Sequence, residues 1–170
     1  MKTHINSLVA WLLLIAVTLI PCTALADPAK AEDDAYSMAV YYTQRGFAMA
    51  PTNHNGVGGT GTVIRFIIPV TRGLDYAFLV GVDQAMRDVD LYVYDEVGNL
   101  ILDDRRPNRR AGVRFRSSYS GTVQVYLHIA SASGLASYSV LVGRRTSAFA
   151  ESADDNPNRA VEEFETPKME

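Results

Sequence analysis

The chain has 170 residues, with 16 basic and 19 acidic side chains, so its formal net charge is −3. A nucleic-acid-binding surface usually needs a marked excess of positive charge, and this near-balance argues against one. The length is enough for one domain with a substantial core, and the single cysteine, Cys22, leaves no disulfide to support that core.

The first 26 residues have the features of a secretory signal peptide. Lys2 gives a positive start, residues 8–20 are uncharged and apolar, and Ala24 and Ala26 place small side chains before a cleavage site. The apolar run is short for a membrane span, and no second run follows. We therefore expect cleavage after Ala26 and a mature protein that is secreted or periplasmic, with no membrane span.

Residues 27–61 are expected to form an extension ahead of the main domain. Asp33 and Asp34 precede apolar residues at helical spacing, among them Tyr36 and Val40. This pattern predicts a helix that is capped by one of the two aspartates and ends near Gly46.

A glycine-rich segment follows the predicted helix. Residues 56–61 match G-x-G-x-x-G letter for letter, which is the motif of a dinucleotide-binding turn. That motif needs a helix directly after it, so that helix-end amides meet the pyrophosphate, whereas a β-type run follows here. We therefore interpret residues 51–61 as a flexible loop and not as a cofactor site.

From residue 62 to 146, apolar side chains alternate with polar ones in short runs separated by turn residues. This period of two is typical of half-buried strands, and the absence of helical spacing between them favours an antiparallel sheet. The segment predicts an all-β domain built as an antiparallel β-sandwich. Its central hairpin turns at Asp95–Asn99, where Gly98 is placed to take a positive φ. The predicted core residues are Ile64, Phe66, Ile68, Val70, Tyr76, Phe78, Val80, Val82, Val89, Leu91, Val93, Val113, Phe115, Val123, Val125, Leu127, Ile129, Tyr138, Val140 and Val142.

The alternation ends near residue 147. Residues 151–170 hold seven acidic side chains and two prolines, and they show neither strand nor strong helical spacing. We expect residues 147–170 to be a disordered acidic tail.

Four stretches resemble one known family. They are Asp88–Asp95, the Gly98-Asn99 turn, Ser120–Leu127 and Ser137–Val142. In this order they resemble the bacterial pre-peptidase C-terminal (PPC) domain: a D-x-D-L strand, a glycine hairpin, a Gly-Thr turn into an alternating strand, and a last strand that opens on tyrosine. The resemblance implies a jelly-roll-like sandwich from an exported protein. It also implies a module that usually accompanies a secreted enzyme, and some collagenase members bind substrate with the help of calcium.

Aromatic side chains on the predicted non-core face suggest a binding surface. If their strands are neighbours, they form a strip suited to a sugar ring or a peptide, because tyrosine offers apolar area with a polar tip. Two alternatives to a binding surface stay open. The aromatic side chains could be ordinary cross-strand pairs, or the predicted helix could lie over the strip. The candidate ligand-binding residues, including two bordering arginines, are Tyr92, Tyr94, Arg114, Arg116, Tyr126 and His128.

Aspartates gather near the central hairpin. Clustered carboxylates are what calcium prefers, although no spaced loop motif accompanies these. The alternative is that they pair with the neighbouring arginines Arg105, Arg106, Arg109 or Arg110, or that they face water. The candidate calcium ligands are Asp88, Asp90, Asp103 and Asp104.

No catalytic motif is present. There is no G-x-S-x-G elbow or H-E-x-x-H pair, and after the signal peptide the histidines are His54 and His128. We therefore expect an exported, non-catalytic binding or accessory module that recognises an extracytoplasmic polymer, either a polysaccharide or a protein. The alternative is a periplasmic protein-partner module, such as an inhibitor or an assembly subunit, that uses its helix or its arginine-rich loop as the contact surface.

Overall fold

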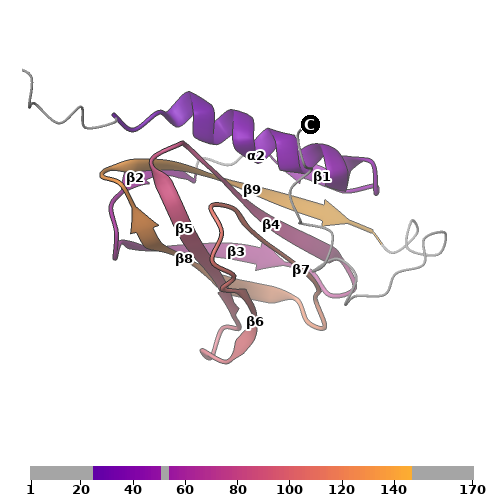
Figure 1. Ribbon diagram of the computed structural model, residues 1–170. Helices are drawn as coiled ribbons and strands as arrows, with labels where there is room; N and C mark the ends of the chain where they lie inside the picture. Colours follow the sequence, from indigo (N-terminus) through magenta and orange to yellow (C-terminus); the bar gives the residue numbers. More distant parts are fainter. Residues whose placement is uncertain (1–24, 51–53, 147–170) are drawn as a thin grey trace, which may run out of the picture.

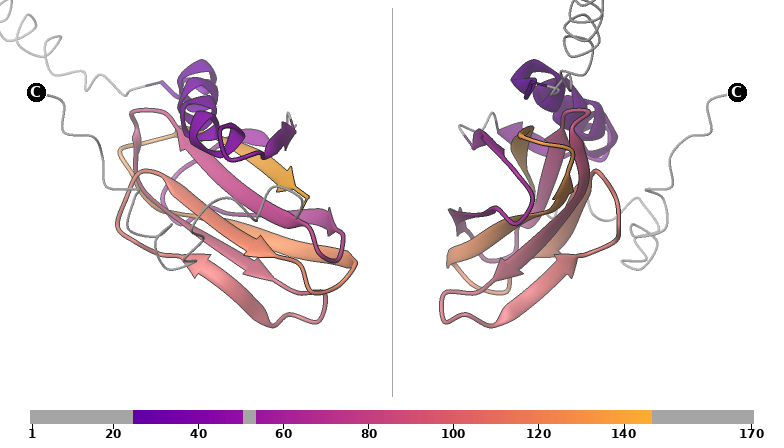
Figure 2. Two further views of the ribbon diagram at one scale, coloured as in Figure 1. Left: turned by 90° about the vertical axis from the view of Figure 1, so that its right-hand side faces the viewer. Right: turned by 60° about the vertical axis from the view of Figure 1, so that its left-hand side comes forward.

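The computed structural model describes residues 25–50 and 54–146. They form a sandwich of two antiparallel sheets with a helix against one outer face (Figures 1 and 2). The predicted all-β class is therefore confirmed. The predicted tail and nearly all of the predicted signal peptide lie outside the described residues.

The elements follow one another along the chain as helix α2 (Pro28–Thr43) and strands β1 (Ala48–Ala50), β2 (Asn55–Gly58), β3 (Val63–Val70), β4 (Asp75–Val82), β5 (Met86–Tyr94), β6 (Leu100–Asp104), β7 (Ala111–Arg116), β8 (Gly121–Ala132) and β9 (Ala136–Arg145). Sheet A has the order β1-β9-β4-β7, with β2 also paired to β9, and sheet B has the order β3-β8-β5-β6. From β2 onward every connection crosses between the sheets except the β5–β6 hairpin. This is the strand order of a jelly roll, as predicted.

The core lies between the sheets and consists of the side chains that the alternation pointed inward. Phe78, Leu91, Val125 and Leu127, for example, are almost completely buried. Side chains from two facing sheets interdigitate over a separation of about 10 Å, so each strand needs only one apolar face. The hairpin prediction is also confirmed, since Gly98 has a φ of 91°.

Helix α2 covers the outer face of sheet A (Figures 1 and 2). A glycine in β4 allows this close approach, because a Cβ on Gly81 would lie 2.0 Å from the backbone nitrogen of Ala35. The helix buries a stripe of mostly small side chains against β4 and β9: Ala31, Ala35, Met38, Ala39 and Tyr42 pack on Ala77, Leu79 and Leu141.

The helix begins earlier than predicted. Asp27 is the N-cap, and its side chain accepts a hydrogen bond from the backbone N–H of Lys30 at 3.1 Å. Pro28 occupies the first turn, where its missing N–H leaves nothing unsatisfied. The predicted caps, Asp33 and Asp34, lie inside the helix instead.

The predicted buried face of the helix was also partly wrong. Tyr36 and Val40 are exposed, because only the alanine stripe fits the short distance to β4. The predicted end near Gly46 is confirmed, since this residue follows the helix with a φ of 81°.

Part of the predicted flexible loop is a strand. Residues 55–58 form β2, and Gly56 lies opposite Tyr138 of β9. A Cβ on Gly56 would lie 2.3 Å from the Tyr138 hydroxyl, so glycine allows the tyrosine ring to lie across the strand. The sandwich therefore starts before residue 62. In the described part of the chain, no helix is both long enough and apolar enough to cross a membrane.

Candidate functional site

The outer face of sheet B is the counterpart of the face that α2 covers, and α2 contacts the strands of sheet A instead. Strand register brings outward side chains from β3, β8 and β5 into three rows, since antiparallel partners share a face. We call this surface the tyrosine face. Its rows are Val63–His128–Asp90, Arg65–Tyr126–Tyr92 and Ile67–Gln124–Tyr94.

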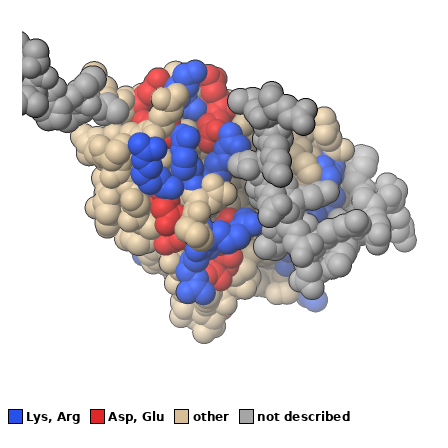
Figure 3. Space-filling view, viewed as in Figure 1, with Lys and Arg blue, Asp and Glu red and all other residues tan. Residues whose placement is uncertain are grey.

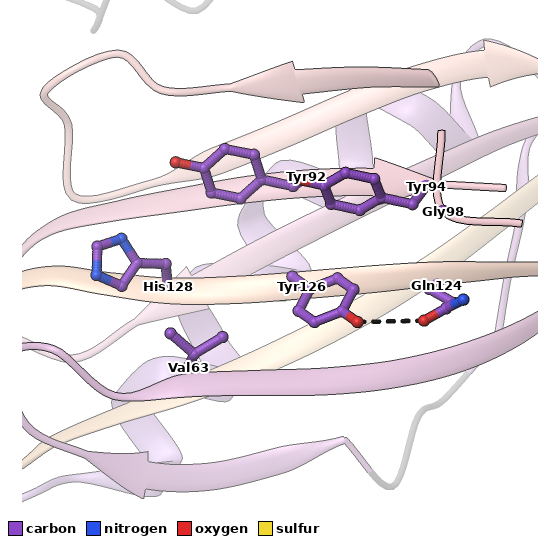
Figure 4. A pocket seen from close by; sticks show the side chains of 7 residues that line it. All are labelled: Val63, Tyr92, Tyr94, Gly98, Gln124, Tyr126 and His128. Carbon is purple, nitrogen blue, oxygen red and sulfur yellow. Dashed lines mark hydrogen bonds between the residues drawn. The ribbon is translucent and has the colours of Figure 1, made fainter. Parts of the chain in front are cut away.

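Three tyrosine rings form the centre of this face (Figure 4). Tyr92 and Tyr94 follow each other on β5 with their rings inclined by 21° and their centroids 6.5 Å apart. Tyr126 of β8 meets Tyr94 edge to face at 5.4 Å, and its hydroxyl donates to Gln124 Oε1 at 3.1 Å. These contacts fix the rings, so a partner that binds here does not have to order them.

A polar group lies at one end of the tyrosine face. His128 Nδ1 is 3.0 Å from Asp90 Oδ2, and the Tyr92 hydroxyl donates to the same oxygen at 3.4 Å. Partial desolvation, followed by the nearby Asp90 carboxylate, raises the pKa of Tyr92. Tyr92 therefore keeps its hydroxyl proton at neutral pH and offers a partner a neutral, polar tip.

The tyrosine face contains an open hollow of about 500 Å³. Gly98, in the β5–β6 turn, closes one end of it (Figure 4). Aliphatic side chains at the margins remain in water: Val63 is 58% exposed, Ile67 55% and Leu100 48%. The remaining lining residues are Tyr92, Tyr94, Gln124, Tyr126 and His128.

The structure therefore brings together four of the six predicted ligand-binding residues. Pairing of β5 with β8 confirms that Tyr92, Tyr94, Tyr126 and His128 are neighbours. The alternative in which the helix covers them is wrong, because α2 packs on sheet A. Their contacts with one another are cross-strand and same-strand pairs, as the other alternative held.

Arg114 and Arg116 do not border the tyrosine face. They lie on β7 of sheet A, where Arg114 is paired with Ala77 and Arg116 with Asp75. Ala77 belongs to the cluster under α2, so Arg114 lies on the helix-covered side of the sandwich. This part of the predicted site was wrong, because membership of a sheet depends on long-range pairing.

Arg65 is a cation that the structure does place on the tyrosine face. It is exposed on β3, opposite Tyr126, and within the described residues it forms no hydrogen bond or ion pair. The sequence held a signal for it, since Arg65 alternates with the inward residues Ile64 and Phe66. The pairing of β3 with β8 is needed to show that Arg65 lies beside Tyr126.

The four candidate calcium ligands do not converge. Asp90 contacts His128, Asp103 pairs with Arg105, Asp104 pairs with Arg106, and Asp88 accepts the backbone N–H of Asn108 at 3.0 Å. Across residues 25–50 and 54–146, no three His, Cys, Asp or Glu side chains gather closely enough to hold a metal ion. The predicted calcium site is therefore wrong, and for Asp103 and Asp104 the arginine-pairing alternative is right.

The arginine-rich loop between β6 and β7 is tied into the fold. Arg110 pairs with Asp34 of α2, and Arg109 donates to the backbone carbonyl of Asp83 at 2.7 Å. On the side of the molecule seen in Figure 3, adjoining basic side chains have acidic side chains above and below them. These arginines stabilise the fold, so the loop is a weaker candidate contact surface than the tyrosine face.

Comparison with known proteins adds little to this geometry. The chain matches no protein-family model and no curated protein, so the resemblance to the PPC domain remains a prediction. Among solved structures it is similar to PliG of Aeromonas hydrophila, a periplasmic inhibitor of g-type lysozyme, with 11% sequence identity and a TM-score of 0.45. The match covers 59% of this chain and 90% of that chain, and we draw no conclusion about function from so distant a likeness.

Proposed function

We propose that this chain is an exported, non-catalytic module that binds a protein partner outside the cytoplasm through the tyrosine face. The observation that carries the proposal is the asymmetry of the sandwich. Helix α2 covers the outer face of sheet A, whereas the tyrosine face has half-buried tyrosines and exposed aliphatic side chains. Exposed apolar surface of this kind is usually an interaction site.

The shape of the surface favours a macromolecule over a small ligand. Pockets for small molecules bury most of the ligand surface, and the open hollow on the tyrosine face does not enclose a ligand in that way. Tyrosine and arginine are enriched where proteins meet, and Arg65 lies in the same row as Tyr126 and Tyr92. The partner is therefore expected to place an acidic or carbonyl group opposite Arg65.

The aliphatic margins favour a protein over a polysaccharide. A sugar ring carries hydroxyl groups around its edge, and these need donors and acceptors when they are desolvated. Val63, Ile67 and Leu100 offer none, whereas they suit the apolar side chains of a protein surface. The tyrosine face thus supports the protein-partner alternative better than a general polymer-binding role.

A polysaccharide is the second candidate, and one observation favours it. The rings of Tyr92 and Tyr94 lie nearly in line along β5, as a chain of sugar rings would require. The aliphatic margins argue against a polysaccharide, and a binding experiment distinguishes the two candidates.

The His128–Asp90 pair does not by itself suggest catalysis. Such a pair activates a nucleophile in many hydrolases, yet among the described residues no serine, threonine or cysteine lines the hollow. We infer that Asp90 holds the imidazole in a fixed orientation for binding.

The test uses the mature chain, immobilised and exposed separately to cell-envelope proteins and to polysaccharides. A protein ligand identified in this way is purified, and its stoichiometric complex is measured by calorimetry. Tyr126→Ala and Arg65→Ala should each weaken that complex at least tenfold, about 1.4 kcal/mol, because central tyrosine and arginine residues dominate interface energies. Tyr36→Ala and Arg72→Ala, which change exposed side chains away from the tyrosine face, are the matched controls.

The outcomes are distinct. A protein complex that survives both Tyr126→Ala and Arg65→Ala would show that the tyrosine face is not the interface. A polysaccharide that binds the chain and is lost in Tyr92→Ala would replace the protein by the second candidate.

A further inference from the structure

A buried carboxylate marks the place where α2 joins the sandwich. Asp83, in the turn between β4 and β5, is only 2% exposed. Its Oδ1 accepts the backbone N–H of Ala85 at 2.9 Å, and its Oδ2 accepts those of Ser137 and Asp27, each at 2.8 Å. Three segments of the chain therefore meet at one side chain.

The partners of this carboxylate are all neutral in the unprocessed chain. Within the described residues, no side-chain cation lies at ion-pair distance from the carboxylate, and Arg109 donates to the backbone carbonyl of Asp83 instead. Backbone N–H groups satisfy the oxygens, but a buried carboxylate is stabilised best by a positive partner.

One of the three donors belongs to the residue that follows the predicted signal peptide. We propose that the Ala26–Asp27 bond is cleaved on export, and that the new α-ammonium group of Asp27 forms an ion pair with Asp83. The proposal rests on the predicted signal peptide and is independent of the function proposed for the tyrosine face.

The chemistry is a peptide hydrolysis by a signal peptidase. Water adds across the C–N bond, so that Ala26 leaves with a carboxylate and Asp27 gains an amino group. An α-amino group has an ordinary pKa of about 8 and is mostly protonated at neutral pH. Cleavage thus converts the amide donor, 2.8 Å from Asp83, into a charged donor at the same position.

The geometry allows the cut without loss of the helix. Leu25 is 89% exposed, so the chain just before the bond is accessible. The cap uses atoms that stay behind: the Asp27 side chain accepts from Lys30 N–H, and the Asp27 carbonyl accepts the N–H of Ala31 at 3.2 Å. A positive charge at a helix N-terminus is unfavourable, and the Asp83 and Asp27 carboxylates offset it.

The consequence is a fold that gains stability on maturation. The ion pair links the start of α2 to the β4–β5 turn and, through Ser137, to β9. The precursor has only the hydrogen bond from the uncharged amide of residue 27 at this position, so it is less stable than the mature chain.

The first test is the identity of the processed N-terminus. The full chain is exported by a bacterial host, and mass spectrometry of the recovered protein should find Asp27 as its first residue. A different first residue would overturn the proposal.

The second test isolates the charge. Acetylation of the Asp27 α-amino group keeps an N–H donor and removes the charge, so it should raise the unfolding equilibrium constant at least tenfold, about 1.4 kcal/mol. The same modification should have no effect in Asp83→Asn, and its full effect should persist in Asp33→Asn, which changes an exposed acid of the same helix. A change below twofold on acetylation of the otherwise unaltered mature protein would refute the ion pair.

A third measurement does not depend on a variant that folds. The α-amino group of the mature protein should be acylated at least tenfold more slowly than that of a peptide with the same first residues. Only the neutral amine attacks the reagent, and the ion pair favours the protonated form. Equal rates would also refute the proposal.

Discussion

Gly81 determines how closely α2 approaches sheet A, and replacing it with alanine tests the arrangement that leaves the tyrosine face uncovered. A Cβ at this position would lie 2.0 Å from Ala35 N and 2.5 Å from Ala31 O. Both are backbone atoms and cannot rotate away. Ordinary contact starts near 3.4 Å, so the helix has to move by about 1 Å or more.

The cost follows from two effects. Overpacking of a close-packed contact costs about 1–3 kcal/mol. The same movement weakens the hydrogen bond from Val82 N–H to Asp34 Oδ2, now 3.1 Å, which is worth about 1 kcal/mol. We expect Gly81→Ala to lower the free energy of unfolding by about 3 kcal/mol, a large part of the stability of a small domain.

Urea unfolding followed by circular dichroism measures this change. Gly59→Ala is the matched control, because its Cβ would be 3.7 Å from the nearest atom, and its effect should stay within about 0.5 kcal/mol. A loss below about 0.5 kcal/mol for Gly81→Ala would show that α2 does not pack here as described. Where the variant is folded, binding at the tyrosine face should be unchanged, since that face belongs to the other sheet.

Two further predictions concern buried polar groups on the side of sheet A. Asp75 accepts hydrogen bonds from Arg145 Nε and Nη2 at 3.3 and 3.2 Å. Asp75→Asn leaves the buried Arg145 without its carboxylate partner and should lower the free energy of unfolding by about 3 kcal/mol, measured by urea unfolding. An unchanged free energy of unfolding would contradict a stabilising role for the pair. Burial raises the pKa of Tyr42 to about 12. Its unfolded value is about 10, so stability should be intact below pH 10 and fall by roughly 2–3 kcal/mol as the pH rises to 12. Tyr42→Phe should flatten that decline, and an unchanged pH profile would refute the assignment.

Most of the strands could be predicted from the sequence because one of their faces is exposed and the other is buried. On β8 the buried Val125 and Leu127 alternate with the partly exposed Gln124, Tyr126 and His128, and this pattern needs no knowledge of the partner strands. The core and the sandwich class follow from such local patterns, whereas the jelly-roll arrangement was implied only by the family resemblance. The pairing of β5 with β8 was only a condition of the predicted site, and the structure fulfils it.

The rest depended on contacts between distant residues. The glycine-rich composition around Gly56 predicts a loop. In the structure Gly56 belongs to β2, and the Tyr138 ring of β9 fills the space that a side chain at residue 56 would occupy. Arg114 and Arg65 alternate with apolar neighbours in the same way on β7 and β3. The local sequence does not indicate that Arg114 lies on sheet A, or that Arg65 lies on sheet B beside Tyr126.

The sequence does contain a signal for which outer face the helix covers, and it lies in β4. Every residue of this strand, from Asp75 to Val82, is buried, and its outward positions hold the small or apolar residues Ala77, Leu79 and Gly81. A strand without a polar face has to be covered on both sides. The outward positions of β8 are polar and aromatic, so no part of the chain has to cover them. A helix with an alanine stripe therefore belongs on β4, and α2 does not cover the tyrosine face.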